Sequence, residues 1–218
     1  MNTMNVRLTL IDSMLGTSPA NEKTYRDWIG SKAPDAATME EEVASLGADA
    51  VADKGMTVFM RYDDGRPMMF AYQIKGFFKS ACKALRSDPD TVSSKLKAYK
   101  GVIDDNMFVY GTEDSKRTGN RIPINFGGDM AVCERPLRAE TMQGPRVTLA
   151  SSEEVPEGST MLIKIKTMNI GKADLQALVR EWLNYGELHG LGQWRNSGRG
   201  RFVWEELDDS GEVIGGNA

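Results

Sequence analysis

The chain has 218 residues, a mass of 24.1 kDa and a formal net charge of −4. Its 40% hydrophobic and 27% charged residues are typical of a globular protein and exclude a disordered chain. No apolar run approaches the roughly 20 residues that span a bilayer, and only two cysteines and one histidine are present. We therefore expect a cytoplasmic protein without signal peptide, membrane contact, disulfide scaffold, metal or cofactor.

The charge is unevenly distributed along the chain. Residues 72–146 contain 13 Lys and Arg against 9 Asp and Glu. Residues 20–66 contain 6 against 10, and residues 147–218 contain 7 against 11. A uniformly basic nucleic-acid binder is excluded, but the basic middle part offers local patches for a polyanionic partner.

The N-terminal part predicts a strand and then two short helices. Apolar residues alternate over residues 6–10, which is typical of a half-buried strand. Ser18 and Pro19 are typical of an N-cap and a first helical residue, so we expect a helix near residues 21–29. A capping box at residues 38–41 predicts a second helix.

A hairpin and a basic amphipathic helix are predicted next. Residues 56–61 and 67–72 flank an Asp-Gly turn, which favours a β-hairpin. Residues 75–86 place apolar residues at helical spacing, with lysines and an arginine on another face. Residues 111–121 are polar and turn-rich, and we expect a long exposed hairpin or loop there.

The C-terminal part predicts a strand, a helix and a last strand. Residues 161–166 alternate in hydrophobicity, and residues 175–183 carry one apolar helical stripe. Residues 201–206 place Phe202 and Trp204 on one face of a strand. Residues 208–218 are polar and glycine-rich, so we expect a flexible tail.

The segment between that helix and the last strand is glycine-rich, and we name residues 189–200 the Gly loop. Gly190, Gly192, Gly198 and Gly200 give the pattern G-x-G-x5-G-x-G. Outward amides of such a loop are suited to phosphate oxygens, and arginine adds a planar fork of donors. Arg195, Arg199 and Arg201 supply these charges, and Trp194 offers a ring on which a base can stack. The simpler alternative is a turn whose glycines only permit tight packing.

A second basic segment begins the helix near residue 75. We expect Lys75, Gly76 and Lys79 in its first turn, where the helix dipole favours anions. The alternative is an ordinary solvated basic face. Arg135, Arg138 and Arg146 either line a groove that follows a nucleic-acid backbone or form surface ion pairs with neighbouring glutamates.

These segments together resemble the RAMP superfamily, which supplies CRISPR effector proteins. Residues 74–81 (IKGFFKSA) are similar to its I-P-G-S-S-L-K-G segment, with Lys75 in place of the proline. Residues 154–160 (EVPEGST) are similar to its L-P-x-G-T turn before a strand, and the Gly loop to its C-terminal glycine-rich loop. The three segments occur in the family's order, and the likeness covers residues 6–10 and 56–206.

The resemblance implies an α+β fold, with a ferredoxin-like (RRM-type) antiparallel sheet, helices on one face and inserted hairpin or helical segments. We expect one domain over residues 1–207, with insertions at about 20–55 and 100–130. The resemblance also implies binding of single-stranded RNA, or single-stranded DNA, along a basic groove. Subunits would stack head to tail as a homo-oligomer or filament, or with other effector subunits.

The resemblance also assigns a "thumb" that reaches over the bound strand to the hairpin around residues 114–121. A mobile charged loop is the alternative. The nucleic-acid-binding residues predicted in all are Lys75, Gly76, Lys79, Lys116, Arg117, Arg121, Arg138, Gly190, Gly192, Trp194, Arg195, Gly198, Arg199, Gly200 and Arg201.

Catalysis is left open but not assigned to any residue. His189 is the only histidine, and a positioned histidine can act as acid or base near neutral pH. An endoribonuclease of the same superfamily using His189 is therefore an alternative to a non-catalytic binder. A further alternative is a phage or mobile-element module that mimics or inhibits a CRISPR complex through protein contacts.

Overall fold

The structure of the protein, a computed structural model, describes residues 1–20, 56–114, 119–141, 144–169 and 174–218. Its strands in chain order are β1 (Asn2–Leu10), β2 (Met14–Leu15), β3 (Ser18–Pro19), β4 (Met56–Val58), β5 (Met60–Arg61), β6 (Pro67–Phe70), β7 (Met107–Gly111), β8 (Arg121–Pro123), β9 (Ala131–Thr141), β10 (Gly144–Val155), β11 (Thr160–Thr167), β12 (Phe202–Leu207) and β13 (Val213–Gly216). Its helices are α3 (Ala71–Leu85), α4 (Tyr99–Asn106) and α5 (Leu175–Asn184), with 3-10 turns η2 (Ser93–Lys95), η3 (Tyr185–Glu187) and η4 (Arg195–Ser197).

The main sheet has the strand order β13-β12-β1-β11-β7 and is antiparallel throughout. The chain passes through β1, α3, β7, β11, α5 and β12, which are two strand–helix–strand halves joined between β7 and β11. The spatial order β12-β1-β11-β7 is that of the ferredoxin-like fold. The predicted α+β fold with a ferredoxin-like antiparallel sheet is therefore confirmed.

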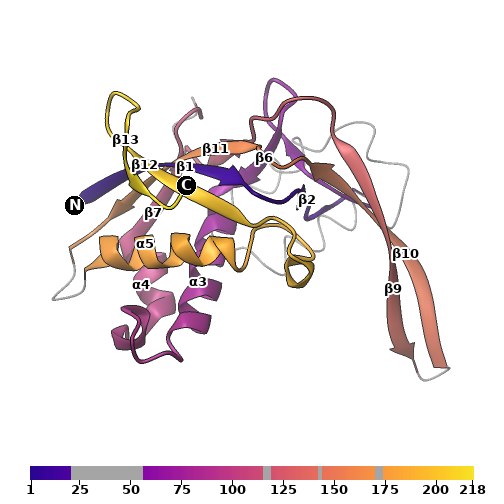
Figure 1. The fold of residues 1–218 in the computed structure, drawn as a ribbon, viewed down its shortest axis with the longest axis horizontal. Helices are drawn as coiled ribbons and strands as arrows, with labels where there is room; N and C mark the ends of the chain where they lie inside the picture. The colour runs from indigo at the N-terminus through magenta and orange to yellow at the C-terminus, as the bar shows by residue number, and fades with distance from the viewer. Residues whose placement is uncertain (21–55, 115–118, 142–143, 170–173) are drawn as a thin grey trace.

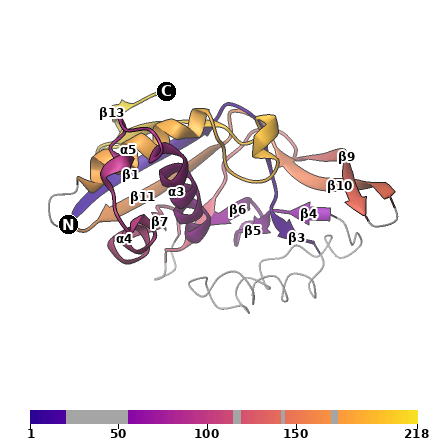
Figure 2. The same ribbon diagram turned by 90° about the horizontal axis from the view of Figure 1, so that it is seen from below.

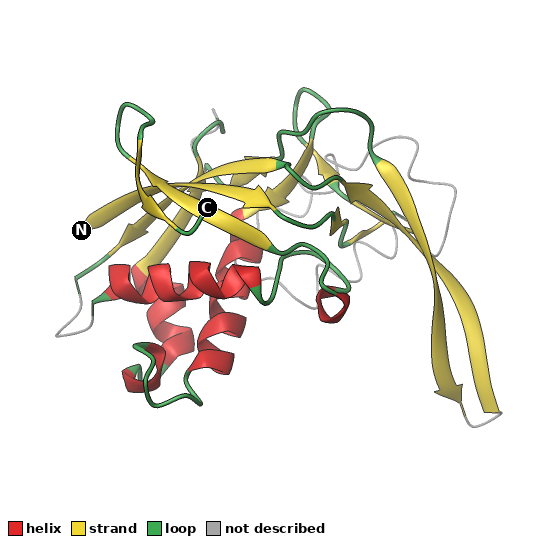
Figure 3. Ribbon diagram, in the orientation of Figure 1, coloured by secondary structure: helices red, strands yellow, loops and turns green. Residues whose placement is uncertain are grey.

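The helices pack on one face of the main sheet, as Figures 1 and 3 show. Alternate residues of β1 and β11 are buried on that face, because side chains in a strand point to opposite sides in turn. Trp182 of α5 is fully buried there, and its indole nitrogen donates a hydrogen bond to the Ser93 hydroxyl at 2.8 Å. α5 begins at Asp174, whose carboxylate accepts hydrogen bonds from the amides of Gln176 and Ala177.

Two smaller sheets complete the fold. One has the order β2-β10-β4-β3, with β9 paired to β10, and the other is β5-β6-β8. The hairpin predicted on either side of the Asp-Gly turn is present, since β5 pairs with β6 and Gly65 adopts a φ of +85°. Within the described residues, β10 and β4 form the one parallel pair of these sheets.

Strands β9 and β10 form a long two-stranded ribbon, which we name the arm. Residues Ala131 and Glu154 pair at its base, and Thr141 and Gly144 pair at its far end. The arm projects away from the rest of the protein in both views (Figure 1, Figure 2). Sequence reasoning did not identify these strands, because Pro136 and Pro145 interrupt the hydrophobic alternation.

Several element predictions differ from the structure. Ser18 and Pro19 form β3, which pairs with β4, instead of starting a helix, and residues 21–55 lie outside the described residues. Residues 100–130, expected to be an insertion, contain β7, which is an integral edge strand of the main sheet. The predicted exposed hairpin at residues 111–121 is not one ribbon, because β7 pairs with β11 whereas β8 pairs with β6.

The C-terminal segment also differs from its prediction. Residues 208–218, expected to be a flexible tail, turn at Asp208 and form β13 at the edge of the main sheet. The Asp208 carboxylate accepts hydrogen bonds from the amides of Ser210 and Glu212, which closes the turn. No helix among the described residues is long and apolar enough to cross a membrane.

Candidate functional site

The Gly loop closes on itself at a narrow neck. The Leu191 amide donates to the Gly200 carbonyl at 2.8 Å, and the Gly200 amide donates to the Ser13 carbonyl at 2.9 Å. A Cβ on Gly190 would lie 2.1 Å from the Gly200 backbone, and a Cβ on Gly200 would lie 2.0 Å from the Leu191 carbonyl oxygen. Glycine is therefore required at both positions by close backbone packing.

Several of the loop amides that were expected to hold a phosphate are occupied by bonds within the protein. Besides Leu191 and Gly200, the amides of Gln193, Ser197 and Gly198 are already bonded to carbonyls of the protein. Gly192 and Gly198 adopt φ values of +79° and +84° and serve the turns of the loop. The glycines therefore have a role in packing and turn formation, and their predicted role in binding stays a prediction.

Of the three arginines in the Gly loop and directly after it, two are matched by carboxylates. Arg199 pairs with Glu154 at 2.5 Å and hydrogen-bonds the Ser13 hydroxyl, and 32% of its side chain is exposed. Arg201 pairs with Asp12 at 2.6 Å, with 41% of its side chain exposed. Asp12, Glu154 and Arg199 also line a hollow of about 430 Å³ together with Asp129 and Glu157. This side of the loop is acidic, so Arg199 and Arg201 do not offer the uncompensated charge that was predicted for them.

Trp194 lies at the surface on top of a buried arginine. Its φ of +56° is in the left-handed region, which costs a residue with a Cβ about 1 kcal/mol or more, and 42% of the residue is exposed. The Arg135 guanidinium lies 5.2 Å from the centre of the indole ring. The ring thus contacts a buried guanidinium and is also partly exposed, and an exposed aromatic ring is suited to base stacking.

Arg135 is itself fixed in place. Only 6% of the residue is exposed, and its terminal nitrogens donate to Ser152 and Gln193, both at 2.9 Å. Among the described residues, its Nε has no hydrogen-bond partner. Sequence reasoning had placed Arg135 with Arg138 and Arg146 in a possible groove. It missed the contact with Trp194, because 59 positions separate the two residues in the sequence.

Arg195 is the remaining arginine of the loop. Among the described residues, it forms no ion pair with a carboxylate, and it lies close enough to His189 to affect its titration. Burial lowers the pKa of His189 below 6.5, and the charge of Arg195 lowers it further. The imidazole is therefore mainly neutral at pH 7, with its ring centre 5.6 Å from that of Tyr185.

Lys75 and Lys79 occupy a different place in their helix from the one predicted. Helix α3 begins at Ala71, so both lysines lie beyond its first turn. The amides at the helix start are also occupied, since that of Phe70 donates to Gln73 and that of Ala71 to Asn120. The expectation that Lys75 and Lys79 lie in the first turn of the helix is therefore wrong.

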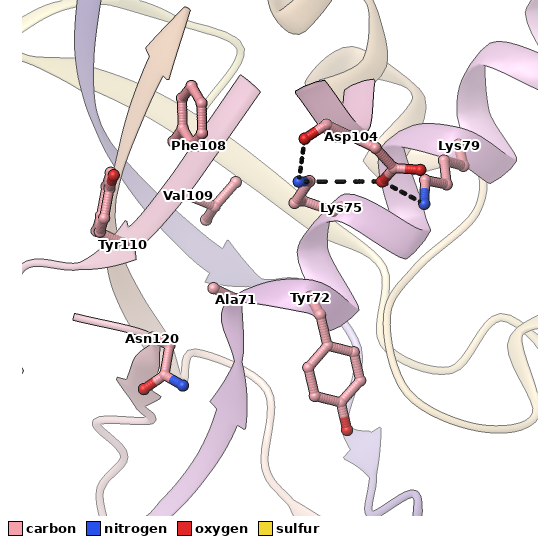
Figure 4. Close-up of a pocket in the computed structure, with 9 residues that line it drawn as sticks. All are labelled: Ala71, Tyr72, Lys75, Lys79, Asp104, Phe108, Val109, Tyr110 and Asn120. Carbon is pink, nitrogen blue, oxygen red and sulfur yellow. Dashed lines mark hydrogen bonds and ion pairs between the residues drawn. The ribbon is translucent and has the colours of Figure 1, made fainter. Parts of the chain in front are cut away.

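Both lysines instead line a hollow of about 190 Å³ at the edge strand β7. Lys79 lies 2.6 Å from Asp104, while Lys75 lies 3.9 Å from that carboxylate and donates to the Asp104 carbonyl at 3.1 Å. Figure 4 shows both lysines turned toward Asp104. One carboxylate facing two lysines leaves a net positive charge at this end of the hollow. Gly76 does not line it.

Of the residues predicted for the thumb, Arg121 lies among the described residues and is buried. Only 1% of the Arg121 side chain is exposed, because it pairs with Asp63 at 2.6 Å and Asp114 at 2.9 Å. Burial alone would lower the pKa of Arg121, but hydrogen bonds to Asp63 and Asp114 outweigh it and raise that pKa. Arg121 therefore acts within the fold and not on a bound strand.

Three other predicted residues lie where no side-chain contact is described. Lys116 and Arg117 fall outside the described residues, and the same holds for the side chain of Arg138 in β9. Within the described part of the chain, no group of three or more His, Cys, Asp or Glu side chains is placed to hold a metal ion.

Comparison with known proteins gives a distant structural likeness. No protein-family model matches the sequence, and no curated protein matches it. The chain is similar to a chain of "Cryo-EM structure of the Type III-B Cmr-beta bound to cognate target RNA", at 11% sequence identity and a TM-score of 0.48. The match covers 99% of this chain and 59% of that chain, so this chain spans less than two thirds of the solved one.

Proposed function

We propose that this protein is a non-catalytic, RAMP-like protein of the cytoplasm that binds single-stranded RNA or single-stranded DNA. The observation that carries the proposal is Trp194, which is held in a strained backbone conformation over the fixed guanidinium of Arg135. Strained residues are retained where surrounding structure and function require them, and a supported, exposed indole suits an unpaired base.

Arg195 supplies the charge for the adjacent phosphate in this proposal. It follows Trp194 directly, and among the described residues it has no carboxylate partner. Arg199 and Arg201 keep the loop attached to residues 12–13 and β10 through their ion pairs. Binding thus rests on fewer loop residues than the sequence suggested, namely Trp194 and Arg195, with Arg135 as their support.

The arm supports the second part of the proposal, which is assembly. Among the described strands, β9 pairs with β10 alone, and a two-stranded ribbon is only marginally stable by itself in water. We propose that the arm lies on a neighbouring copy or effector subunit, so that copies assemble head to tail along the bound strand. A head-to-tail contact that does not close into a ring produces a filament.

The experiment that tests binding uses a fluorescently labelled single-stranded oligonucleotide, in RNA and DNA forms, and fluorescence anisotropy. Loss of one stacked base in Trp194→Ala should weaken binding about five- to hundredfold, whereas Trp194→Phe should retain most of it. The affinity falls as salt rises, so the slope of log K against log salt is negative. In Arg195→Ala the size of this slope should decrease by about 0.7, the value for one phosphate contact to a single strand.

The matched control is Lys97→Ala, which removes one exposed positive charge away from the Gly loop. It should leave the affinity nearly unchanged. Absence of binding to both RNA and DNA, or equal affinities of wild type, Trp194→Ala and Arg195→Ala, would refute the proposed function. Each variant's thermal unfolding midpoint shows whether the fold is retained.

The endoribonuclease alternative has less support. Among the described residues, no carboxylate or carbonyl group orients the His189 imidazole through a hydrogen bond. General acid–base catalysis requires such positioning within reach of the reacting proton. Cleavage of a labelled RNA by the wild type, abolished in His189→Ala while binding persists, would establish this alternative.

A further inference from the structure

The face of the main sheet opposite the helices carries basic and aromatic side chains. Figure 3 shows α3, α4 and α5 on one side of the sheet. Strand alternation therefore places the partly exposed residues of each strand on the other side. Among these residues, the basic and aromatic ones are Arg7 in β1, Lys164 and Lys166 in β11, and Phe108 and Tyr110 in β7. We name this set the open face.

The strand register places these side chains next to one another. Lys164 lies opposite Tyr110, and Lys166 lies opposite Phe108. Directly paired residues on one face of an antiparallel sheet are within contact distance. The Lys166 amine lies 5.4 Å from the centre of the Tyr110 ring, so the diagonal pair also interacts.

The charge of the open face is positive. Arg7 is balanced by Glu205 at 2.7 Å. In the described part of the chain, neither Lys164 nor Lys166 has a carboxylate within ion-pair distance. The Asn5 side-chain oxygen, in the same row as Lys164, is buried and has no hydrogen-bond partner among the described residues. The open face therefore combines two aromatic rings with two lysines that have no described carboxylate partner.

The two rings also line the hollow that contains Lys75 and Lys79 (Figure 4). β7 is the edge strand of the main sheet, so the open face continues around this edge into the hollow. The hollow's volume of about 190 Å³ is below the size of a typical drug-sized ligand pocket, but a planar ring occupies less space. The side chains of Phe108 and Tyr110 thus have Lys164 and Lys166 on one side and Lys75 and Lys79 on the other.

From this arrangement we infer a second strand-binding site, at which one nucleotide of a bound single strand places its base against Tyr110 and Phe108 and its phosphate near Lys164 and Lys166. The inference rests on the proposed function and adds a surface to it. Rings beside cations suit a ligand with both an aromatic and an anionic part, whereas an acidic peptide would use only the lysines.

The test uses the same labelled oligonucleotides with three variants. Tyr110→Leu removes the ring but keeps apolar bulk, Tyr110→Phe keeps the ring, and Lys166→Gln removes one charge. We expect about five- to hundredfold weaker binding for Tyr110→Leu, near wild-type binding for Tyr110→Phe and a smaller salt slope for Lys166→Gln. Lys97→Gln is the charge-matched control.

Photo-crosslinking locates the base directly. A strand that contains 5-iodouridine is bound, irradiated and digested with the protein, and the crosslinked peptide is identified by mass spectrometry. Crosslinks at Tyr110 or Phe108, together with weaker binding of Tyr110→Leu, would support the site.

Two other outcomes would distinguish a failure of the second site from a failure of the proposed function. Crosslinks confined to Trp194, with unchanged affinity of Tyr110→Leu and Lys166→Gln, would overturn the second site and leave the function intact. Binding of poly-glutamate that depends on Lys166, without oligonucleotide binding by any form of the protein, would overturn both in favour of a protein partner.

Discussion

The neighbourhood of His189 shows how single residues of the Gly loop influence one another. The imidazole is half-buried against Tyr185 and close to the positive charge of Arg195. Both effects disfavour the protonated ring, so its pKa lies below 6.5. Because the chain has one histidine, His189 reports on the loop without interference from other imidazoles.

We predict that the pKa of His189, measured by NMR titration, rises in Arg195→Ala but stays below 6.5, since burial remains. The unfolded chain takes up the proton first as the pH falls below about 6.5, so stability should decrease from there down to the folded-state pKa. That decrease should be smaller in Arg195→Ala. A bound oligonucleotide should raise the pKa, because a phosphate offsets the charge of Arg195. An unchanged pKa in Arg195→Ala would contradict the assigned contact.

At the scale of elements, the arm is the part that the rest of the fold explains least. Its base is tied to the fold, because β10 pairs with β2 and β4 and Glu154 pairs with Arg199. Beyond the base, β9 and β10 pair with each other and extend away from the main sheet (Figure 2). An exposed ribbon that contributes little to its own subunit is expected to act in contacts with a partner.

We predict that the arm can be shortened without loss of the fold. Pro136 and Leu149 are opposite each other, so replacing residues 137–148 by Asn-Gly should close a two-residue hairpin turn. The free energy of unfolding should change by less than about 1 kcal/mol, because the strand segments that are removed pair only with each other. Light scattering should show loss of assembly, while the affinity for a short strand is retained. Assemblies of wild-type mass from the shortened protein would exclude the arm from the subunit contact.

For the whole molecule, a net charge of −4 coexists with local positive surfaces. Acidic residues line the hollow beside Arg199, whereas Lys75, Lys79, Lys164 and Lys166 lie around β7. A strand guided by these charges would follow the basic side and avoid the acidic one. The acidic surface would remain available for basic regions of a neighbouring subunit.

We predict that the protein purified without nuclease carries nucleic acid and has a mass above that of one 24.1 kDa chain. The ratio of absorbance at 260 and 280 nm and light scattering on the same sample measure both properties. Raising the salt concentration should release the nucleic acid, because cations of the salt then replace the protein's lysines and arginines at the phosphates. A monomer without nucleic acid at low salt would contradict assembly on a strand, and co-purification with protein alone would favour the interaction-module alternative.

Local patterns in the sequence were sufficient for β1, β11, β12 and α5, but not for the edge strands β7 and β13. Alternation at residues 6–10 and 161–166 and the helical stripe at residues 175–183 predicted β1, β11 and α5, because periodicity depends only on which face is buried. The hairpin of β5 and β6 was also predictable from a local signal, the Asp-Gly turn between the two strands. The arm was missed because Pro136 and Pro145 interrupt the hydrophobic alternation of its two strands.

The site was predictable only in part. The sequence by itself determined which residue types gather near the last strand, including Trp194 and the arginines. Only the tertiary structure decided which of them remain available. It pairs Arg199 with Glu154, Arg201 with Asp12 and Arg121 with Asp63 and Asp114, and it places Arg135 beneath Trp194. The reason is physical: whether a charge is compensated depends on contacts between residues far apart in the chain, which no local pattern encodes.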